Sequence, residues 1–161
     1  MDKHQQSQKD KLFKPSHGDP YLEVLPRGSA QCPQCGAVHD HGRWSWQRAV
    51  PKGAQAHVCP ACRRIADDQP AGTLHLAGGF LAAHREEVLG LIHNTEAAEK
   101  AQHALERLIK VSEQEDGLQV TTTGTHLAQR LGHALSGAFK GECSYQYAED
   151  ELHLTVHWSR D

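Results

Sequence analysis

The sequence predicts an α+β fold in two parts, and three observations lead to that prediction. Four of the five cysteines form two Cys-x-x-Cys pairs within residues 30–66, a segment with few apolar residues for a core. Beyond residue 72, apolar residues follow alternating and helical spacings in turn, which indicates strands and helices. The length of 161 residues suits one compact domain with a small appendage. We therefore expect a unit over residues 30–66 and a larger unit over residues 72–160, after a flexible arm over residues 1–29.

The arm and the cysteine usage indicate where the protein works. Its first residues, MDKHQQSQKDKLFK, lack the apolar stretch of a secretory signal. No apolar run approaches the roughly 18 residues that cross a bilayer. Paired cysteines in such a chain favour a metal over disulfides, and so a reducing compartment. We expect a cytoplasmic protein with no membrane contact. The residues that could anchor the arm are Tyr21, Leu22, Val24 and Leu25.

The two cysteine pairs predict a zinc ribbon that holds one structural zinc ion. Zn²⁺ favours four tetrahedral ligands, and each Cys-x-x-Cys turn supplies two thiolates. The 23 residues between the pairs are enough for a hairpin. Gly36 follows the first pair and suits a positive φ, whereas Arg63 follows the second pair and predicts a turn of different shape. The predicted ligands are Cys32, Cys35, Cys59 and Cys62.

Other readings of these residue types stay open. Iron in a rubredoxin-like site would use the same four thiolates, although such sites usually have glycine after both pairs. A redox-active dithiol would need only one Cys-x-x-Cys, beside a βαβ unit. His39, His41 and His57 could substitute for a ligand, but four cysteines leave them at the surface or beside the site. Cys143 is expected to be a small buried residue.

The larger unit begins with a strand, a helix and two strands. Residues 73–77 alternate as a strand, and residues 80–105 follow helical spacing, with an interruption or restart at Asn94. The next strand is expected over residues 107–112, with Ile109 and Val111 facing inward. An Asp-Gly turn then leads into another alternating run.

A second helix and two further strands complete the unit. Thr125 is expected to cap the helix and Gly141 to follow its end. Residues 143–147 and 152–158 then alternate as strands. The order of the first six elements matches the ferredoxin-like, split βαβ plan, so we expect a two-layer sandwich with both helices on one sheet face. The opposite face would be a solvated surface or a docking platform, with His75, Gln119, Thr121, Thr123, Ser144, Gln146, His153, Thr155 and His157.

Charge is divided unevenly along the chain. Residues 1–64 carry ten Lys/Arg against five Asp/Glu, and residues 65–161 carry seven against fifteen. An anionic partner would therefore meet the first part. Cations beside flat aromatic side chains are the combination that holds phosphates and stacks bases of single-stranded nucleic acid. The predicted nucleic-acid-binding residues are Arg43, Trp44, Trp46, Arg48, Lys52, Arg63 and Arg64. The alternative is that both tryptophans pack the ribbon against the larger unit.

The sequence predicts a binding protein and not an enzyme. It contains no defensible glycine-rich phosphate loop, nucleophile elbow or catalytic carboxylate pair. The first expectation is a zinc-ribbon protein that binds RNA or the ribosome. The alternative is a protein–protein adaptor with a purely structural zinc. In the first case, basic ribosomal proteins could meet the acidic first helix of the larger unit through Glu86, Glu87, Glu96 and Glu99.

Several segments are similar to known proteins: CPQCG, GRWSW, CPACRRIADDQPAG, LAAHREEVLGLI and DGLQVTTTGTHLAQRLGHAL. They resemble an uncharacterised family of small bacterial zinc-ribbon proteins. More distantly, they resemble the N-terminal part of the adaptor family that exports the large ribosomal subunit. The resemblance covers about residues 30–160 and implies contact with the ribosome or its RNA. The adaptors have further cysteine sets and a long C-terminal extension with transport signals, so export is not implied.

Overall fold

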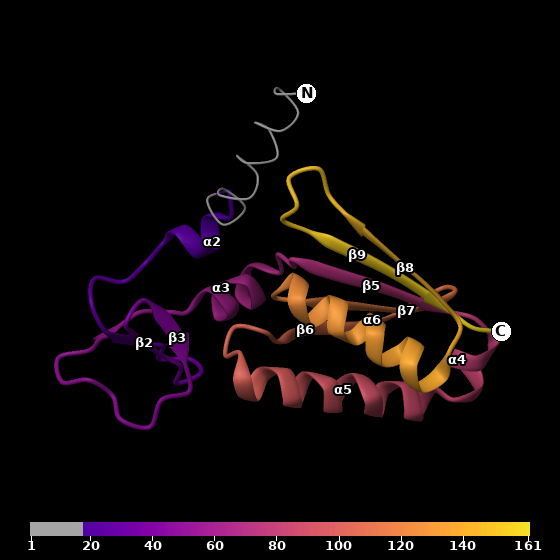
Figure 1. Ribbon diagram of the computed structural model, residues 1–161, viewed down its shortest axis with the longest axis horizontal. Coiled ribbons are helices and arrows are strands. Elements are labelled where there is room, and N and C mark those ends of the chain that lie inside the picture. The colour runs from indigo at the N-terminus through magenta and orange to yellow at the C-terminus, as the bar shows by residue number, and fades with distance from the viewer. Residues whose placement is uncertain (1–17) are drawn as a thin grey trace.

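Two separate sheets make up this computed structural model, which describes residues 18–161 (Figure 1). A four-stranded sheet lies in the N-terminal part and holds the four paired cysteines. A mixed five-stranded sheet with helices follows it. The predicted α+β class is confirmed. Residues 1–17 of the predicted arm lie outside the described residues.

The small sheet is built from four very short strands in the order β3-β2-β1-β4. β2 pairs antiparallel with β1 and β3, and β4 joins the other edge of β1 in parallel. So few ladder hydrogen bonds do not stabilise an isolated sheet in water, and another constraint is needed. The strands are β1 (Ala30–Gln31), β2 (Val38–Asp40), β3 (Arg43–Ser45) and β4 (Gln55–Ala56). Two short helices flank them in the chain, α2 (Pro20–Glu23) and α3 (Pro60–Asp67).

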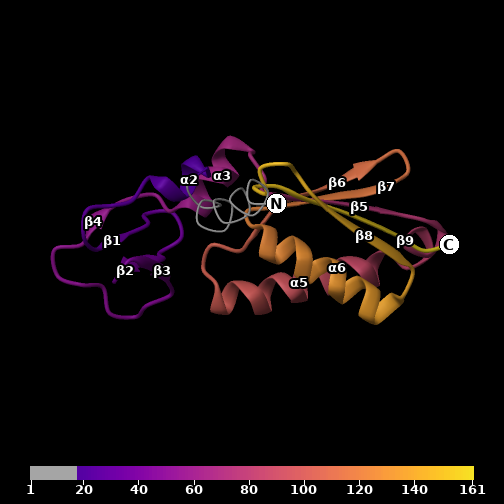
Figure 2. The same ribbon diagram turned by 45° about the horizontal axis from the view of Figure 1, so that its top comes forward.

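The large sheet has the order β6-β7-β5-β9-β8. Its strands are β5 (Gly72–Ala77), β6 (Leu108–Gln114), β7 (Gly117–Thr122), β8 (Glu142–Tyr147) and β9 (Leu154–Ser159). Its helices are α4 (Gly79–Ala83), α5 (Arg85–Gln102) and α6 (Thr125–Phe139). Figures 1 and 2 show α5 and α6 side by side on one face of the sheet, as the sequence predicts.

The order of strands departs from the ferredoxin-like plan at one point. In that plan the fourth strand pairs with the first, but here the fifth strand, β9, lies between them. β9 runs parallel to β5, and β8 forms the edge of the sheet. Burial accounts for this order, because Leu154, Val156 and Trp158 of β9 are fully buried whereas β8 is mostly exposed. The more apolar strand of the last hairpin occupies the interior position.

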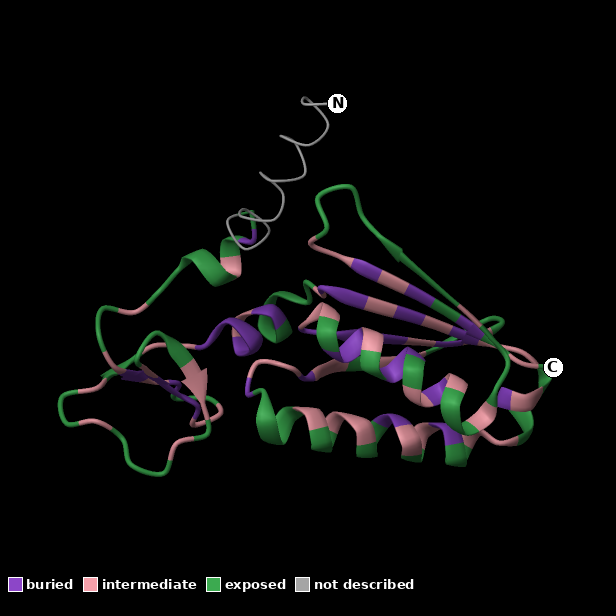
Figure 3. Ribbon diagram, viewed as in Figure 1, coloured by how far each residue is buried: buried purple, intermediate pink, exposed green. Residues whose placement is uncertain are grey.

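The core lies between the large sheet and its helices. Leu74 and Leu76 of β5 alternate with half-buried positions, and Figure 3 shows a similar alternation of buried and less buried residues along β9. Leu131 and Leu135 of α6 fill the space above these strands. The other sheet face carries polar side chains, and the imidazoles of His75 and His157 stack there with ring centroids 4.8 Å apart. Thr121 and Thr123, which the sequence also assigns to this face, are buried instead.

Several local predictions need correction. Helix α5 runs unbroken past Asn94 and ends at Gln102, short of residue 105. The N-cap of α6 is Gly124, one residue before the predicted Thr125. Ile109 does not join the core, because the pairing register of β6 shifts between Leu108 and Lys110 and leaves it in a bulge.

The described end of the arm is anchored by polar contacts. The buried carboxylate of Asp19 forms an ion pair with Arg64 at 2.8 Å. The Tyr21 hydroxyl donates a hydrogen bond to Asp67 at 2.7 Å, and the Arg64 guanidinium lies 4.4 Å from the Tyr21 ring centroid. The three aliphatic anchors expected from the sequence are instead exposed: Leu22, Val24 and Leu25.

Candidate metal centre

The first cysteine pair forms a tight turn at the end of β1. The amide of Gly36 donates to the Cys32 carbonyl at 2.9 Å, and the amide of Cys32 donates to the Ala37 carbonyl at 2.8 Å. The amide of Ala37 points at the Cys35 sulfur, 3.4 Å away. Gly36 has φ +88°, the left-handed conformation that its position predicts.

The second pair begins helix α3 and has a different shape, as Arg63 predicts. Cys59 is the N-cap of the helix, and Pro60 occupies its first turn without losing a needed donor. The Cys59 sulfur accepts from the amide of Cys62 at 3.4 Å. The chain continues helically at Arg63, so this position needs no glycine. Both sulfurs also lie at the positive end of the helix dipole, which favours thiolates.

The four sulfurs converge as a metal site requires. The ligand atoms of Cys32, Cys35, Cys59 and Cys62 all lie within 4.8 Å of one another. The Cys35 and Cys59 sulfurs are 3.8 Å apart. Four thiolates at about 2.3 Å from one tetrahedral zinc would stand about 3.8 Å from each other. The predicted residues therefore form a plausible single metal site.

A buried arginine from the larger unit completes the centre. The Nη2 atom of Arg107 donates to the sulfurs of Cys35 at 3.0 Å and Cys59 at 3.4 Å, and Nη1 donates to Cys62 at 3.2 Å. The Nε atom of Arg107 donates to the Ala104 carbonyl, which fixes the guanidinium. Arg107 is only 6% exposed. No pattern in the sequence singles out Arg107 as part of the centre.

Arg107 offsets part of the charge of the centre. Four thiolates and a divalent ion together carry a charge of about −2, which one guanidinium reduces to about −1. Burial lowers the pKa of Arg107, but hydrogen bonds and charge from Cys62, Cys59 and Cys35 outweigh burial and raise it. Burial raises the pKa of Cys59, while the Cys62 amide and Arg107 oppose that rise. The guanidinium thus stays charged and favours the thiolate forms that bind a metal.

Both tryptophans of the ribbon contact the larger unit or the cysteines. The Trp46 indole lies 5.4 Å from the Arg107 guanidinium, and its Nε1 donates to the Lys100 carbonyl of α5 at 2.6 Å. Trp44 packs on the cysteine cluster together with Leu105. Its ring also meets His39 edge-on at 5.2 Å. These contacts agree with the alternative interpretation, in which the tryptophans pack the small sheet against the larger unit.

The histidines near the cysteines are neighbours of the site. His39 is buried and its Nδ1 lies 3.2 Å from the Gly28 carbonyl, while His57 lies beside Trp44 with ring centroids 6.1 Å apart. His41 is exposed. None of the three belongs to the group of converging sulfurs. Cys143 is far along the chain and packs against the core of the large sheet, although it is half-buried and not buried as predicted.

The predicted nucleic-acid-binding cations separate into two groups. Arg43, Arg48 and Lys52 are exposed on the small sheet and its loops. Arg64 is buried in its ion pair with Asp19, and its Nη1 also donates to the Gln69 carbonyl, so it is not free to meet a phosphate. Arg63 is half-buried, with its guanidinium 5.2 Å from the Tyr21 ring centroid.

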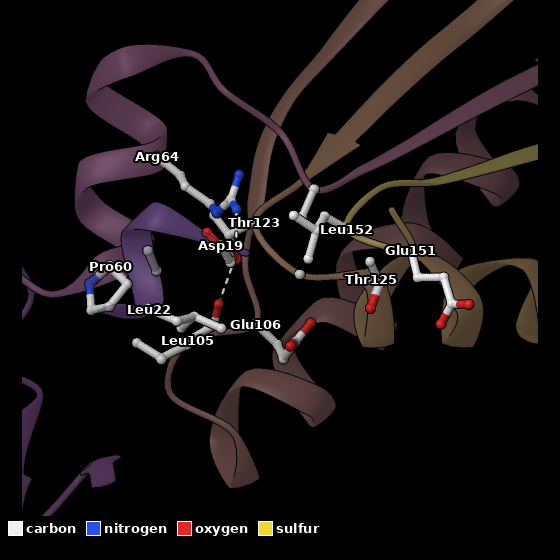
Figure 4. A pocket seen from close by; sticks show the side chains of 13 residues that line it. Asp19, Leu22, Pro60, Arg64, Leu105, Glu106, Thr123, Thr125, Glu151 and Leu152 are labelled. Carbon is white, nitrogen blue, oxygen red and sulfur yellow. Dashed lines mark hydrogen bonds and ion pairs between the residues drawn. The ribbon is translucent and has the colours of Figure 1, made fainter. Parts of the chain in front are cut away.

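The Arg64–Asp19 pair borders a cleft of about 410 Å³ between α2, α3 and the large sheet. Figure 4 shows the two side chains facing each other, with Glu106 and Leu152 on the other walls. Glu106 accepts a hydrogen bond from the Leu127 amide at 2.8 Å. The side chains of Asp19, Arg64 and Glu106 therefore each have an ion-pair or hydrogen-bond partner within the protein. The sequence prediction that the protein is not an enzyme stays a prediction.

The acidic helix offers less free charge than the sequence predicts. Glu96 accepts from the amide of Leu108, and Glu99 accepts from His126 and Arg130. Both glutamates are only half-exposed, whereas Glu86 and Glu87 are exposed at the start of α5. Only the beginning of the helix could present acidic side chains to a basic partner.

Comparison with known proteins adds no family to these observations. No protein-family model matches the chain, and no curated protein is significantly similar to it. Among the described residues, no helix has the length and apolar character needed to cross a membrane.

Proposed function

We propose that the protein is a non-enzymatic zinc-ribbon protein that binds RNA or the ribosome through its small sheet. The observation that carries the proposal is the set of exposed cations on that sheet. In the part of the chain that the structure describes, the side chains of Arg43, Arg48 and Lys52 make no ion pair. The nearby acid Asp40 accepts instead from Gln47 at 3.0 Å.

Zinc is the metal that best suits this proposal. Four thiolates with no open position are typical of structural zinc, which holds small units that have little core of their own. Arg107 is compatible with a basic surface on this unit, because its guanidinium offsets part of the negative charge of the cysteine cluster. The cations above can therefore still attract phosphates.

The resemblance found in the sequence supports the same partner. The similar segments span both sheets, and the ribosomal adaptors also place a cysteine ribbon before an acidic helix. In the larger unit, β6, β7 and β5 lie in the order that the first three strands of a ferredoxin-like sheet would have, which is compatible with that resemblance. With its excess of acidic residues, this unit would position the ribbon rather than bind RNA, because an acidic surface repels phosphates within a Debye length of about 8 Å.

The test is the salt dependence of RNA binding by the unmodified chain and by the double variant Arg43→Ala with Arg48→Ala. Each phosphate contact with a single strand contributes about 0.7 to the slope of log affinity against log salt. The double variant should bind a fluorescent single-stranded RNA more weakly, with a slope reduced by about 1.4. Fluorescence anisotropy at a series of salt concentrations measures both.

Arg85→Ala with Lys140→Ala is the matched control, because it removes the same charge from the large unit, where Arg85 pairs with Glu113. Its slope should equal that of the unmodified chain. If both double variants behave alike, the small sheet is not the contact surface. If the unmodified chain binds no RNA and no ribosome at low salt, the adaptor alternative takes the place of this proposal.

A further inference from the structure

A second group of metal-ligating side chains lies where the C-terminal end of α5 meets the N-terminal end of α6. Glu99 lies in the last turn of α5, and His103 is the C-cap of that helix, with its amide donating to the Glu99 carbonyl at 2.8 Å. His126 is the second residue of α6. Figure 1 shows these two helix ends next to each other, on the side of the large sheet that faces the small sheet. Ligand atoms of the three residues all lie within 4.8 Å of one another.

The arrangement of the three side chains suits a shared ion. The Nε2 atom of His126 is 2.8 Å from the Oε1 atom of Glu99. The imidazoles of His103 and His126 stand nearly perpendicular, at 74°, with ring centroids 5.2 Å apart. Two imidazoles that bind one ion, each through a nitrogen about 2.1 Å away, have centroids about 5 Å apart. Little movement is therefore needed to bring both rings onto one ion.

Neighbouring groups orient the carboxylate and supply negative charge. Arg130 donates from Nε to the outer oxygen of Glu99, Oε2, at 3.2 Å, which leaves Oε1 turned toward His126. Such outer contacts hold ligands in place in known metal sites. A second acidic side chain, Glu106, accepts a hydrogen bond at 2.8 Å from the amide of Leu127, the residue after His126. It adds a second acidic group beside the cluster, which favours a cation.

We propose that Glu99, His103 and His126 form a second metal site, separate from the four cysteines, that binds a divalent transition ion such as Zn²⁺ or Ni²⁺. Two imidazoles and one carboxylate are ligands that these ions accept. With three protein ligands, at least one coordination position stays open to water. His103 and His126 are exposed, and a bound ion must displace the hydrogen bond between His126 and Glu99. The site therefore holds its ion more weakly than four thiolates, and dialysis against metal-free buffer empties it.

The experiment titrates Zn²⁺ into the full chain after such dialysis, with the cysteine site still loaded. Calorimetry should show one further ion per chain. His103→Ala and His126→Ala should each weaken that binding at least tenfold, and so should Glu99→Gln. His93→Ala is the matched control, because His93 is also exposed on α5 but lies outside the cluster. It should leave the affinity unchanged.

A second measurement needs no variant. In NMR spectra of the unmodified chain, the ring signals of His103 and His126 should shift together as the first added equivalent binds, and those of His93 should not. Circular dichroism of each variant without added metal must match the unmodified chain, because Glu99 also joins α5 to α6. The absence of a further bound ion would overturn the proposal. So would ring signals of His103 and His126 that stay in place while the ion binds elsewhere.

Discussion

Replacing Cys35 or Cys59 by serine is expected to release the metal and unfold residues 30–66, while the large sheet stays folded. The strands of the small sheet are two or three residues long, and its apolar cluster consists mainly of the cysteines themselves. Metal binding contributes about 10 kcal/mol or more to the folding of such units. The large sheet has its own core of leucine, valine and tryptophan side chains. Amide NMR spectra would show the two regions separately.

Cys143→Ser is the control for these variants, because its sulfur packs against the other core. It should keep the metal and the signals of residues 30–66. A Cys59→Ser chain that retains a full equivalent of metal and a folded small sheet would contradict the proposed role of the centre. Loss of signals throughout the chain would show that residues 72–160 do not fold on their own.

Arg107→Met is expected to have the second largest effect. Methionine has similar length but cannot donate to Cys35, Cys59 and Cys62, so the charge of the metal centre stays buried without its partner. Removing one member of a buried charge pair costs about 3–5 kcal/mol. We expect a lower melting temperature and a metal that is lost to a chelator much faster. Absorbance of a zinc-sensitive dye with time measures that loss.

Two further variants separate the role of charge from that of packing. Arg107→Lys keeps the charge but cannot reach three sulfurs with one ammonium group, so it should recover only part of the metal retention. Arg85→Met removes an exposed arginine that pairs with Glu113, and it should release metal at the unmodified rate. Equal rates of metal release in the Arg107→Met and unmodified chains would show that the guanidinium does not stabilise the centre.

The ligands could be predicted from the sequence, whereas Arg107 could not. The spacing within each Cys-x-x-Cys pair is local, and it dictates a turn that brings two sulfurs together. The contacts of Arg107 with the sulfurs span 45 to 72 residues. They depend on how the start of β6 meets the small sheet, and no local pattern records that. A lone arginine before a strand gives no such signal.

The order of strands in the larger unit could not be predicted from local sequence patterns either. Alternation predicts each strand, including both members of the last hairpin, but it does not say which member pairs with β5. The signal available was composition: Leu154, Val156 and Trp158 share one face of β9, whereas β8 combines exposed Tyr145 and Tyr147 with polar residues. The interior strand is the one with more apolar surface to bury.

The predicted nucleic-acid-binding residues show why residue type alone could not distinguish residues free to contact a partner from residues with structural contacts. Arg63 and Arg64 are adjacent, but α3 turns Arg64 toward Asp19 and leaves it buried. Trp44 and Trp46 could have stacked bases, yet they contact the cysteine cluster and Arg107. Of the five predicted cations, Arg43, Arg48 and Lys52 keep exposed side chains, so the proposed contact surface has fewer cations than the sequence predicts.

X-ray absorption at the zinc edge tests the central claim most directly, on the full chain after dialysis against metal-free buffer. The four cysteine sulfurs converge within 4.8 Å, and dialysis is expected to remove any ion from the proposed second site at Glu99, His103 and His126. The spectrum should fit four sulfur neighbours at about 2.3 Å and no nitrogen or oxygen neighbour. Iron in place of zinc, or a shell with fewer than four sulfurs, would contradict a closed zinc centre built from Cys32, Cys35, Cys59 and Cys62.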